Sequence, residues 1–441
     1  MRRLQNRCVI VALIASLLQK EVNGTKGSKN LEFKSDITST FLKTVSAYSN
    51  FGTGVIEFGR LDNGEIKGID DPDKFCLDVE NKINDSIHPK PDYSLKVNRN
   101  KKIVVLTVHE GRYKPYLYKG KAYRRSDTAT IEVDQLELKR LTLEGSNMYF
   151  EELPCKETKL TFAYFESKLK EKLDISNITD DMLKTLGFFT ADKKYNIAAS
   201  LFADKNSFYG IDYARFGKNI SEILDRDTFT NCSILKQYDD IVSAFRRYYQ
   251  YEKIQGFERR TVDRIPEEAF REAVANALVH RTWDINAHIK VSMYDDKIVI
   301  TSPGGLPKGL SKEEYISGNI SYLRNPVIGN VFFRLGYIEM FGTGIGRILA
   351  SYELFTKKPT FEVFDNSISV ILPTISLTYS ITTDGEELLK VLSNGIQLSS
   401  TEIAKRIGWS KDKTIRTLNA LKSAGYIEVF GKARGTKYAK R

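Results

Sequence analysis

The first third of the chain alternates between helical and strand-like patterns of apolar residues. Apolar positions in residues 38–50 recur with a helical period, and residues 71–86 form a second such stretch. Residues 55–70 and 93–111 alternate with a period of two around short polar turns, which predicts two β-hairpins. Strands with helices to cover one face predict an α+β module, which we place over residues 28–144.

The middle of the chain mixes longer helices with short strand-like runs. Residues 234–251 and 267–281 have helical periods, and residues 198–204 resemble a strand. We therefore predict a connector of helices and strands over residues 145–261, followed by a second mixed domain over residues 262–375.

The C-terminal pattern is three short helices and a hairpin. Helical periods cover residues 386–395, 399–410 and 411–425, and two strand-like runs follow in residues 426–441. This order predicts a winged helix-turn-helix over residues 380–441. The whole chain is thus expected to be an α+β multidomain protein.

Composition adds a class of partner to this outline. The chain has 441 residues, enough for two to four domains at about 150 residues each. Its formal net charge of +11 favours an acidic partner such as nucleic acid. The four cysteines form no CxxC pair and the four histidines have no zinc spacing, which indicates reduced thiols and a cytoplasmic protein.

An apolar run near the N-terminus follows two arginines. Residues 8–18 are too few to span a bilayer as a helix, which takes roughly 20 apolar residues. We therefore expect residues 1–27 to be an N-terminal helix or extension that packs on the next domain, and no membrane partner. The sequence is also compatible with a homo-oligomer.

Basic residues and tyrosines are interleaved in residues 114–125. Basic groups pair with phosphates, and tyrosine rings stack on bases at roughly 1–3 kcal/mol each. The alternative is a half-buried pair of strands with a solvated outer face, and both interpretations stay open. The candidate nucleic-acid contacts in this stretch are Lys119, Lys121, Tyr123, Arg124 and Arg125.

The helix at residues 267–281 carries Glu272 and Asn276 one turn apart, so that they share a face. An asparagine oxygen is a suitable ligand for a Mg²⁺ ion that bridges phosphates. A glutamate one turn earlier can activate an attacking water. His280 and Arg281 follow by about one turn and are further candidates for phosphate contact, although cations also suit a helix C-terminus.

A glycine-rich loop that leads into a helix strengthens this hypothesis. Backbone N–H groups and the helix dipole at such a junction can hold a phosphate, while the alternative is a tight turn with close helix packing. An earlier glycine turn follows the strand-like run that ends near residue 302. The candidate nucleotide contacts in the two glycine segments are Gly304, Gly305, Gly342, Thr343, Gly344, Gly346 and Arg347.

The motifs of the first module occur in an order that resembles the Schlafen/AlbA-type DNA-binding domain of prokaryotic regulators. They are LEFK (31–34), FLKTVSAYSNFGTGVIEFG (41–59), GIDDP (68–72) and YRRSDTATIEVDQLELKRL (123–141). The resemblance implies binding of nucleic acid, including single-stranded DNA or RNA. Some relatives of this fold are RNA-cleaving nucleases with an acidic cluster. Glu32 occupies a matching position, but residues 25–30 supply no second carboxylate and Asp62 lies in a turn, so nuclease activity is an alternative.

The motifs of the second mixed domain resemble the Bergerat (GHKL) ATP-binding fold, in the divergent form found beside AlbA-type domains. They are EAVANALVHR (272–281), ITSPGGLPKGL (300–310), RNPVIGNVFFRLGYIE (324–339) and FGTGIGRI (341–348). The resemblance implies an α/β sandwich that binds ATP and Mg²⁺. The Bergerat pattern has an aspartate that accepts from the adenine amino group, and this chain has Ser302 in that motif instead. Such proteins are often called RecG-like, but the chain has no GxxxxGK[ST] helicase loop.

The third helix of the C-terminal module is the one expected to enter the major groove of DNA. Residues 405–441 contain eleven Lys/Arg and two acids, which favours double-stranded DNA over a protein partner. Candidate contacts on this helix are Ser410, Lys411, Lys413, Thr414 and Arg416, and those on the wing are Lys432 and Arg434.

These features predict a DNA-binding transcriptional regulator that responds to a nucleotide. Two alternatives remain from the same residues. One is an enzyme, either an ATPase that uses Glu272 or a nuclease that uses Glu32. The other is a DNA-binding protein whose ATPase-like domain is a degenerate scaffold.

Overall fold

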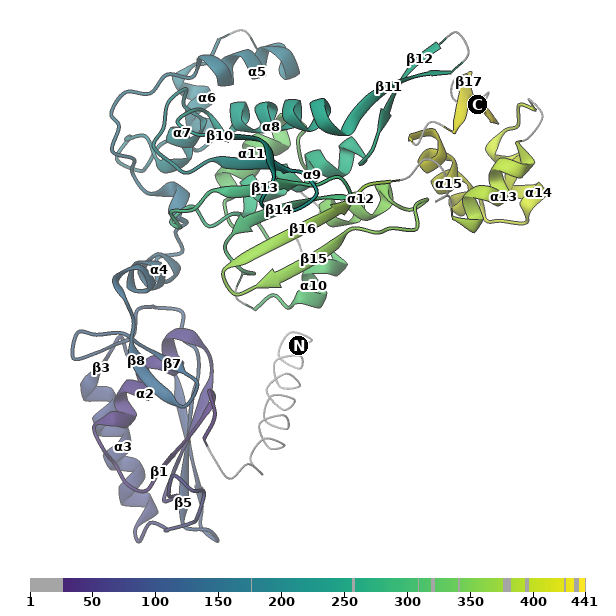
Figure 1. Ribbon diagram of the computed structural model, residues 1–441. Coiled ribbons are helices and arrows are strands. Elements are labelled where there is room, and N and C mark those ends of the chain that lie inside the picture. The colour runs from purple at the N-terminus through teal and green to yellow at the C-terminus, as the bar shows by residue number, and fades with distance from the viewer. Residues whose placement is uncertain are drawn as a thin grey trace. The chain divides into compact units, whose positions relative to one another are not determined.

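The chain folds into two units, one of residues up to Met148 (unit 1) and one of Tyr149–Arg441 (unit 2) (Figure 1). Both contain helices and sheets, which confirms the α+β multidomain class. The predicted N-terminal extension and the wing residues Lys432 and Arg434 lie outside the described residues. This computed structural model describes residues 27–175, 177–255, 258–307, 309–318, 322–339, 342–375, 382–392, 396–423, 426–431 and 436–440.

A four-stranded sheet forms the centre of unit 1. Its order is β1 (Leu31–Lys34), β2 (Gly54–Phe58), β5 (Ile103–Val108) and β4 (Tyr93–Asn98), with β1 parallel to β2 and the other pairs antiparallel. The hairpin predicted in residues 93–111 is confirmed as β4–β5. The hairpin predicted in residues 55–70 is wrong: β2 pairs with β1 and β5, and the segment after it contributes one bridge between Arg60 and Ile66.

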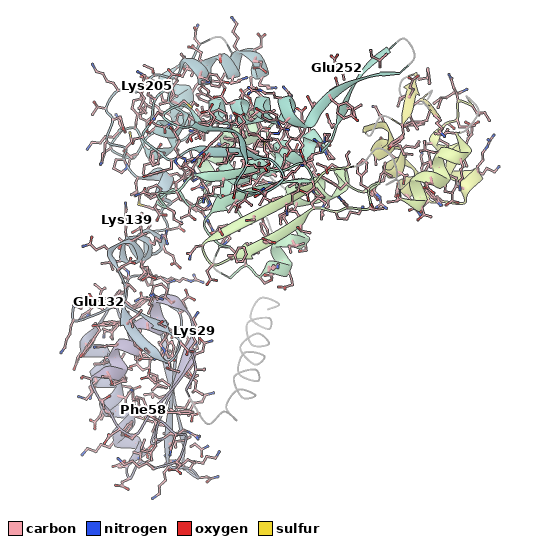
Figure 2. All side chains as sticks on the ribbon, in the orientation of Figure 1. Lys29, Phe58, Glu132, Lys139, Lys205 and Glu252 are labelled. Atoms are coloured by element: carbon pink, nitrogen blue, oxygen red, sulfur yellow. The ribbon has the colours of Figure 1, made fainter. Side chains whose placement is uncertain are left out.

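Helices α2 (Thr40–Phe51) and α3 (Pro72–Ser86) pack with the sheet in one core that includes Phe58 (Figure 2). The short strands β3 (Ile87–His88) and β6 (Leu117–Tyr118) form an antiparallel pair, and β3 directly follows α3.

A hairpin of β7 (Tyr123–Ser126) and β8 (Ala129–Glu132) contacts α2, and α4 (Gln135–Gly145) follows it. Tyr116, Tyr118 and Tyr123 are buried in the same core as α2. The half-buried strand pair is therefore the correct interpretation of these tyrosines.

A six-stranded sheet forms the centre of unit 2. All neighbouring strands are antiparallel except β9 and β13, which run parallel. Two of its strands, β10 and β9, come from the stretch predicted as a connector. The order is β10 (Ile223–Phe229), β9 (Ile211–Phe216), β13 (Ile289–Met293), β14 (Lys297–Pro303), β16 (Ser367–Pro373) and β15 (Thr360–Phe364).

Helices α8 (Ile234–Tyr249) and α9 (Glu267–His280) pack on each other and on this sheet. The strand expected at residues 198–204 is wrong, because Asn196 caps a helix there, α7 (Ile197–Phe202). The remaining elements before residue 375 are η1 (Phe150–Glu152), α5 (Ala163–Leu173), α6 (Asp180–Thr185), β11 (Gln250–Gln255), β12 (Glu258–Asp263), α10 (Lys312–Ser317), α11 (Pro326–Arg334) and α12 (Gly344–Ser351). No helix among the described residues has the length and apolarity to cross a bilayer.

The C-terminal part of unit 2 has the predicted order of three helices and a hairpin. Its core joins apolar residues of all three helices, and Leu354 from the segment after α12 belongs to the same core. The elements are α13 (Thr383–Val391), α14 (Ser400–Ile407), α15 (Lys411–Ser423), and the antiparallel strands β17 (Ile427–Phe430) and β18 (Lys437–Lys440).

A buried carboxylate fixes the start of α11. Glu151 is 0% exposed and accepts hydrogen bonds from the backbone N–H groups of Val327 at 2.6 Å and Ile328 at 2.9 Å. Burial raises the pKa of Glu151 to about 8, and the two N–H donors oppose that rise. The start of α11 is therefore held by a residue that lies far away in the sequence.

We expect the substitution Glu151→Gln to flatten the pH dependence of stability between pH 5 and 8. The folded protein keeps the Glu151 proton up to a pKa of about 8. The unfolded chain releases it in the usual range near 4.3, so wild-type stability falls as pH rises, by at most about 1.4 kcal/mol per pH unit. Urea unfolding at several pH values measures this slope, and parallel profiles for the two proteins would contradict it.

Candidate functional site

One cavity in unit 2 brings together predicted site residues from three separate segments. Its walls include α9, the turn after β14 and the glycine loop before α12, with apolar side chains such as Ile300, Leu323 and Val370 between them. The predicted site residues that line the cavity are Glu272, Asn276, His280, Gly304, Gly305, Gly342 and Gly344.

Glu272 is held between two helices. Its side chain is 6% exposed, and its Oε2 lies 3.0 Å from Nη2 of Arg347 on α12. Its Oε1 accepts a hydrogen bond from Nδ2 of Asn276 at 3.3 Å. Burial raises the pKa of Glu272, and the Arg347 guanidinium partly offsets this rise. The predicted water-activating carboxylate is thus at the cavity wall and paired with a predicted phosphate contact.

Gly344 allows α12 to approach α9 closely. A Cβ atom at this position would lie 2.5 Å from Oε1 of Glu272 and 2.8 Å from Nδ2 of Asn276. Gly346 has nothing within 4 Å of such an atom, and Thr343 is exposed at the N-cap of α12. The absence of a Cβ at Gly344 therefore leaves room for the ends of the Glu272 and Asn276 side chains, and the first turn of α12 lies directly beside the Glu272–Asn276 face.

The opposite part of the cavity wall is built around Gly304, which has a φ of 107°. A Cβ atom here would lie 2.0 Å from Oγ1 of Thr282. Arg324 donates hydrogen bonds to Thr282 and to the Gly305 carbonyl oxygen. Ser302 donates its hydroxyl to the Ala277 carbonyl oxygen at 3.0 Å, so a neutral side chain bound to α9 stands where the Bergerat pattern has an aspartate.

His280 and Arg281 differ in position although they are adjacent in sequence. His280 lines the cavity, and burial together with the nearby Arg324 guanidinium lowers the pKa of His280 to about 4. It is therefore neutral at pH 7. Arg281 is buried elsewhere and donates to the carbonyl oxygens of Tyr209 at 2.7 Å and Ala287 at 2.6 Å. Its guanidinium holds a loop together and is unsuited to the predicted phosphate contact.

Sequence reasoning missed Thr282, Arg324 and Glu339 as parts of this site. Arg324 and Glu339 line the cavity, and Thr282 contacts Arg324. Arg324 directly precedes the Asn325-Pro326 start of α11, a cap signal that fixes the local backbone but not the direction of the arginine.

The predicted nucleic-acid contacts of unit 1 fall into two groups. Lys119 and Lys121 are exposed, and Lys121 pairs with Glu132 at 2.7 Å. Tyr123 is buried in the core, so its ring is not available to stack on a base as predicted. Arg124 is half-buried, and Arg125 is buried beside Glu32 at 3.1 Å.

The acidic cluster of a metal-dependent nuclease is missing from the part of the chain that the structure describes. Those residues contain no group of three or more His, Cys, Asp or Glu side chains that could hold a metal ion. Glu32 instead pairs with Lys34 at 2.7 Å and with Arg125 at 3.1 Å. The nuclease alternative therefore has no site among the described residues.

The predicted DNA contacts on α15 are only partly accessible. Ser410 and Lys411 are exposed, whereas Thr414 is buried. Lys413 pairs with Asp384 at 2.9 Å, and Arg416 pairs with Glu353 at 2.9 Å. The Arg416 partner lies just after α12, in the same part of the chain as the glycine loop.

Two family models match parts of the chain. Residues 27–134 match the family described as "Schlafen, AlbA_2". Residues 286–372 match the family described as "Putative ATP-dependent DNA helicase recG C-terminal", a match that begins after α9. These matches confirm the Schlafen/AlbA-type resemblance and the RecG-like resemblance of the second mixed domain, and they relate the chain to DNA- and ATP-related proteins. The Bergerat fold itself stays a prediction.

Solved structures and curated proteins add little to these matches. The DIP2311 protein from Corynebacterium diphtheriae has 19% identity and a TM-score of 0.47, covering 99% of this chain and 97% of its own. The N-terminal domain of a Nitrosomonas europaea protein described as a "Putative ATP-dependent DNA Helicase RecG-related Protein" has 26% identity and a TM-score of 0.20, covering 25% of this chain and 86% of its own. No functionally curated protein matches significantly.

We expect Gly344→Ala to destabilise the protein by about 1–3 kcal/mol, because the added methyl meets Glu272 and Asn276. Gly346→Ala is the matched control in the same helix. It meets open space and is expected to stabilise the protein by about 0.5–1 kcal/mol through helix propensity. Urea unfolding of both variants measures the difference, and equal effects would contradict the close approach of α12 to α9.

Proposed function

We propose that the protein is a DNA-binding regulator whose central domain binds a nucleotide, with ATP and Mg²⁺ as the expected ligands. The observation that carries the proposal is the meeting of α9 and the glycine loop at one cavity. Glu272 and Asn276 lie about seventy residues before Gly344 in the sequence, yet all three line the same wall. A helix N-terminus suits a phosphate and an amide oxygen suits the Mg²⁺ that accompanies it, with the carboxylate beside them as the candidate for activating a water.

The residues present fit such a ligand at its phosphate end. Asn276 supplies an amide oxygen for Mg²⁺, which would bridge the phosphates. The N–H groups at the start of α12, beside Gly342 and Gly344, would hold phosphate oxygens. The apolar wall suits a base or sugar, and the neutral His280 adds a polar group that carries no charge at pH 7.

Recognition of the base is expected to differ from that of a typical Bergerat domain. Ser302 gives its hydroxyl to α9, and Arg324 places a donor group beside Gly305. The adenine amino group would meet the neutral serine hydroxyl, a weaker acceptor than the aspartate carboxylate of the Bergerat pattern. Weak discrimination among nucleotides follows, which suits a sensor more than a dedicated ATPase.

A second candidate is slow hydrolysis of the bound nucleotide. Its support is the raised pKa of Glu272, which brings this carboxylate closer to the range of a general base. Its Arg347 partner opposes the rise, and a phosphate that attracts Arg347 would release the carboxylate.

The arrangement of α12 supports a response to the nucleotide. Arg347 on α12 pairs with Glu272 at the cavity, and Glu353 just after α12 pairs with Arg416 of α15. Leu354 also packs in the C-terminal core. A phosphate that competes for Arg347 would therefore act on the segment that holds α15. Coupling of this kind needs different nucleotide affinities in the two arrangements.

We expect Asn276→Ala to weaken binding of a fluorescent ATP analogue with Mg²⁺ by at least about tenfold, which equals about 1.4 kcal/mol. Asn286→Ala is the matched control, because Asn286 is an exposed asparagine in the loop after α9. Fluorescence titration measures both affinities. Unchanged binding in Asn276→Ala would exclude the proposed pocket, and a wild-type protein that binds no nucleotide would favour the degenerate scaffold.

We expect Arg416→Ala to weaken binding of duplex DNA and to lower its salt dependence by about one counterion. Glu353→Gln should have the opposite effect, because it frees Arg416 from its pair. Fluorescence anisotropy at several salt concentrations measures both changes. If Glu353→Gln leaves the affinity unchanged while Arg416→Ala lowers it, the winged helix binds DNA but the Glu353 contact does not restrain it.

A further inference from the structure

Unit 1 contains a polar cavity of about 200 Å³ that is separate from the exposed lysines of the predicted nucleic-acid face. Its walls come from the turn before β1, the C-terminal part of α2, β7 and α4. We call it the Tyr48 cavity and define it by Lys29 (Figure 2), Tyr48, Phe51, Arg124, Arg125 and Glu137.

Two buried donors in this cavity lack acceptors. Tyr48 is 2% exposed, and its hydroxyl has no hydrogen-bond partner. The Nε atom of Arg125 also has no hydrogen-bond partner. Burial raises the pKa of Tyr48, so its hydroxyl stays protonated and able to donate. Buried polar groups are almost always hydrogen-bonded in folded proteins, so two such donors at one cavity indicate a missing acceptor.

The Tyr48 ring is fixed in place. A Cβ atom on Gly54 would lie 2.3 Å from the ring, which shows that the ring packs directly on the β2 backbone. The Arg125 guanidinium lies over the ring, 5.9 Å from its centroid. The Nη groups of Arg125 donate to Glu32, Thr130 and the Ser28 carbonyl oxygen, so the guanidinium is fixed as well. The cavity is preorganised on this side.

The charge of the cavity favours an anion. Lys29, Arg124 and Arg125 outnumber the two nearby carboxylates, Glu137 at 3.2 Å from Nε of Arg124 and Glu32 at 3.1 Å from Nη1 of Arg125. Cations also suit the C-terminal end of α2, so charge alone would not identify a ligand. The unpartnered donors at the same cavity indicate a phosphate, because a phosphate oxygen accepts from both a hydroxyl and a guanidinium.

An aromatic residue at the cavity suggests the rest of the ligand. Phe51 is 37% exposed, and a nucleic-acid base can stack on such a ring. A phosphate that continues in both directions would have to pass through a partly enclosed cavity, whereas a terminal phosphate enters from one side.

We propose that the Tyr48 cavity binds the terminal phosphate of a nucleic-acid strand, with the adjoining base against Phe51. This inference rests on the proposal that unit 1 binds nucleic acid. A free nucleoside monophosphate has the same chemistry, and the experiment separates the two sources.

The test compares short single-stranded oligonucleotides of one sequence that end in a 5′-phosphate, a 3′-phosphate or hydroxyl groups only. The full-length protein is expected to bind one of the phosphorylated strands at least about tenfold more tightly than the hydroxyl strand, as a charge-assisted site would. Fluorescence anisotropy measures the ratio. The comparison of strand ends cancels contributions from other nucleic-acid contacts.

Tyr48→Phe is the decisive variant. It removes the unpartnered hydroxyl and keeps the ring, so the free energy of unfolding should be unchanged while the preference for the phosphate falls about three- to tenfold. Tyr113→Phe is the control, because Tyr113 is 74% exposed. Lys29→Ala should also lower the preference for the phosphorylated strand, because it removes a positive charge from the cavity. Lys101→Ala removes the same charge from an exposed turn and should leave this preference unchanged.

The outcomes are distinct. Equal binding of phosphorylated and hydroxyl strands overturns the strand-end site but leaves nucleic-acid binding by unit 1 intact. Absence of binding to any strand overturns both proposals. Displacement of the strand by a nucleoside monophosphate at the same affinity assigns the cavity to free nucleotides and overturns the strand end. A Tyr48→Phe variant that keeps the full preference overturns the role of the cavity.

Discussion

A carboxylate that is 6% exposed needs a partner inside the protein, and Glu272 has Arg347 and Asn276. This contact depends on the absence of a side chain at Gly344, because any Cβ atom there would displace the carboxylate. The packing of α12 on α9, the shape of the cavity and the direction of Arg347 all follow from it. A single ion pair thus defines the wall at which a phosphate would be bound.

The same contact gives the cavity a physical connection to the C-terminal helices. Helix α12 is eight residues long, and the segment directly after it holds Glu353 and Leu354. Leu354 shares a core with α13 to α15, so that segment cannot move without affecting the C-terminal module. In the proposed response, competition for Arg347 would be a local change of charge next to the segment that contacts α15. It would require no large rearrangement of the six-stranded sheet.

Local sequence signals predicted those elements whose stability is mostly local. Helix α3, the β4–β5 turn and the C-terminal helices were placed correctly because periodicity and turn residues act over a few positions. The hairpin predicted in residues 55–70 is not formed because β2 pairs with β1 and β5, and β5 is distant in sequence.

For the site, Glu272, Asn276 and Gly344 were identifiable by motif. Arg281 was misjudged because sequence does not show which way a side chain at a helix end is directed, and Arg324 was missed for the same reason.

Unit 1 shows how pairing decides between binding and cleavage. Glu32 occupies a position that the Schlafen/AlbA-type resemblance links to nucleases, yet it pairs with Lys34 and Arg125. The described residues form no group of three or more His, Cys, Asp or Glu side chains that could hold a metal ion. A carboxylate paired with two cations is a poor metal ligand, since the metal would have to displace both. The same pairing fixes Arg125 beside Tyr48 and leaves its Nε as a buried donor. The pairing that occupies Glu32 thus also places Arg125 at the Tyr48 cavity, and it is on this arrangement that the proposed anion site rests.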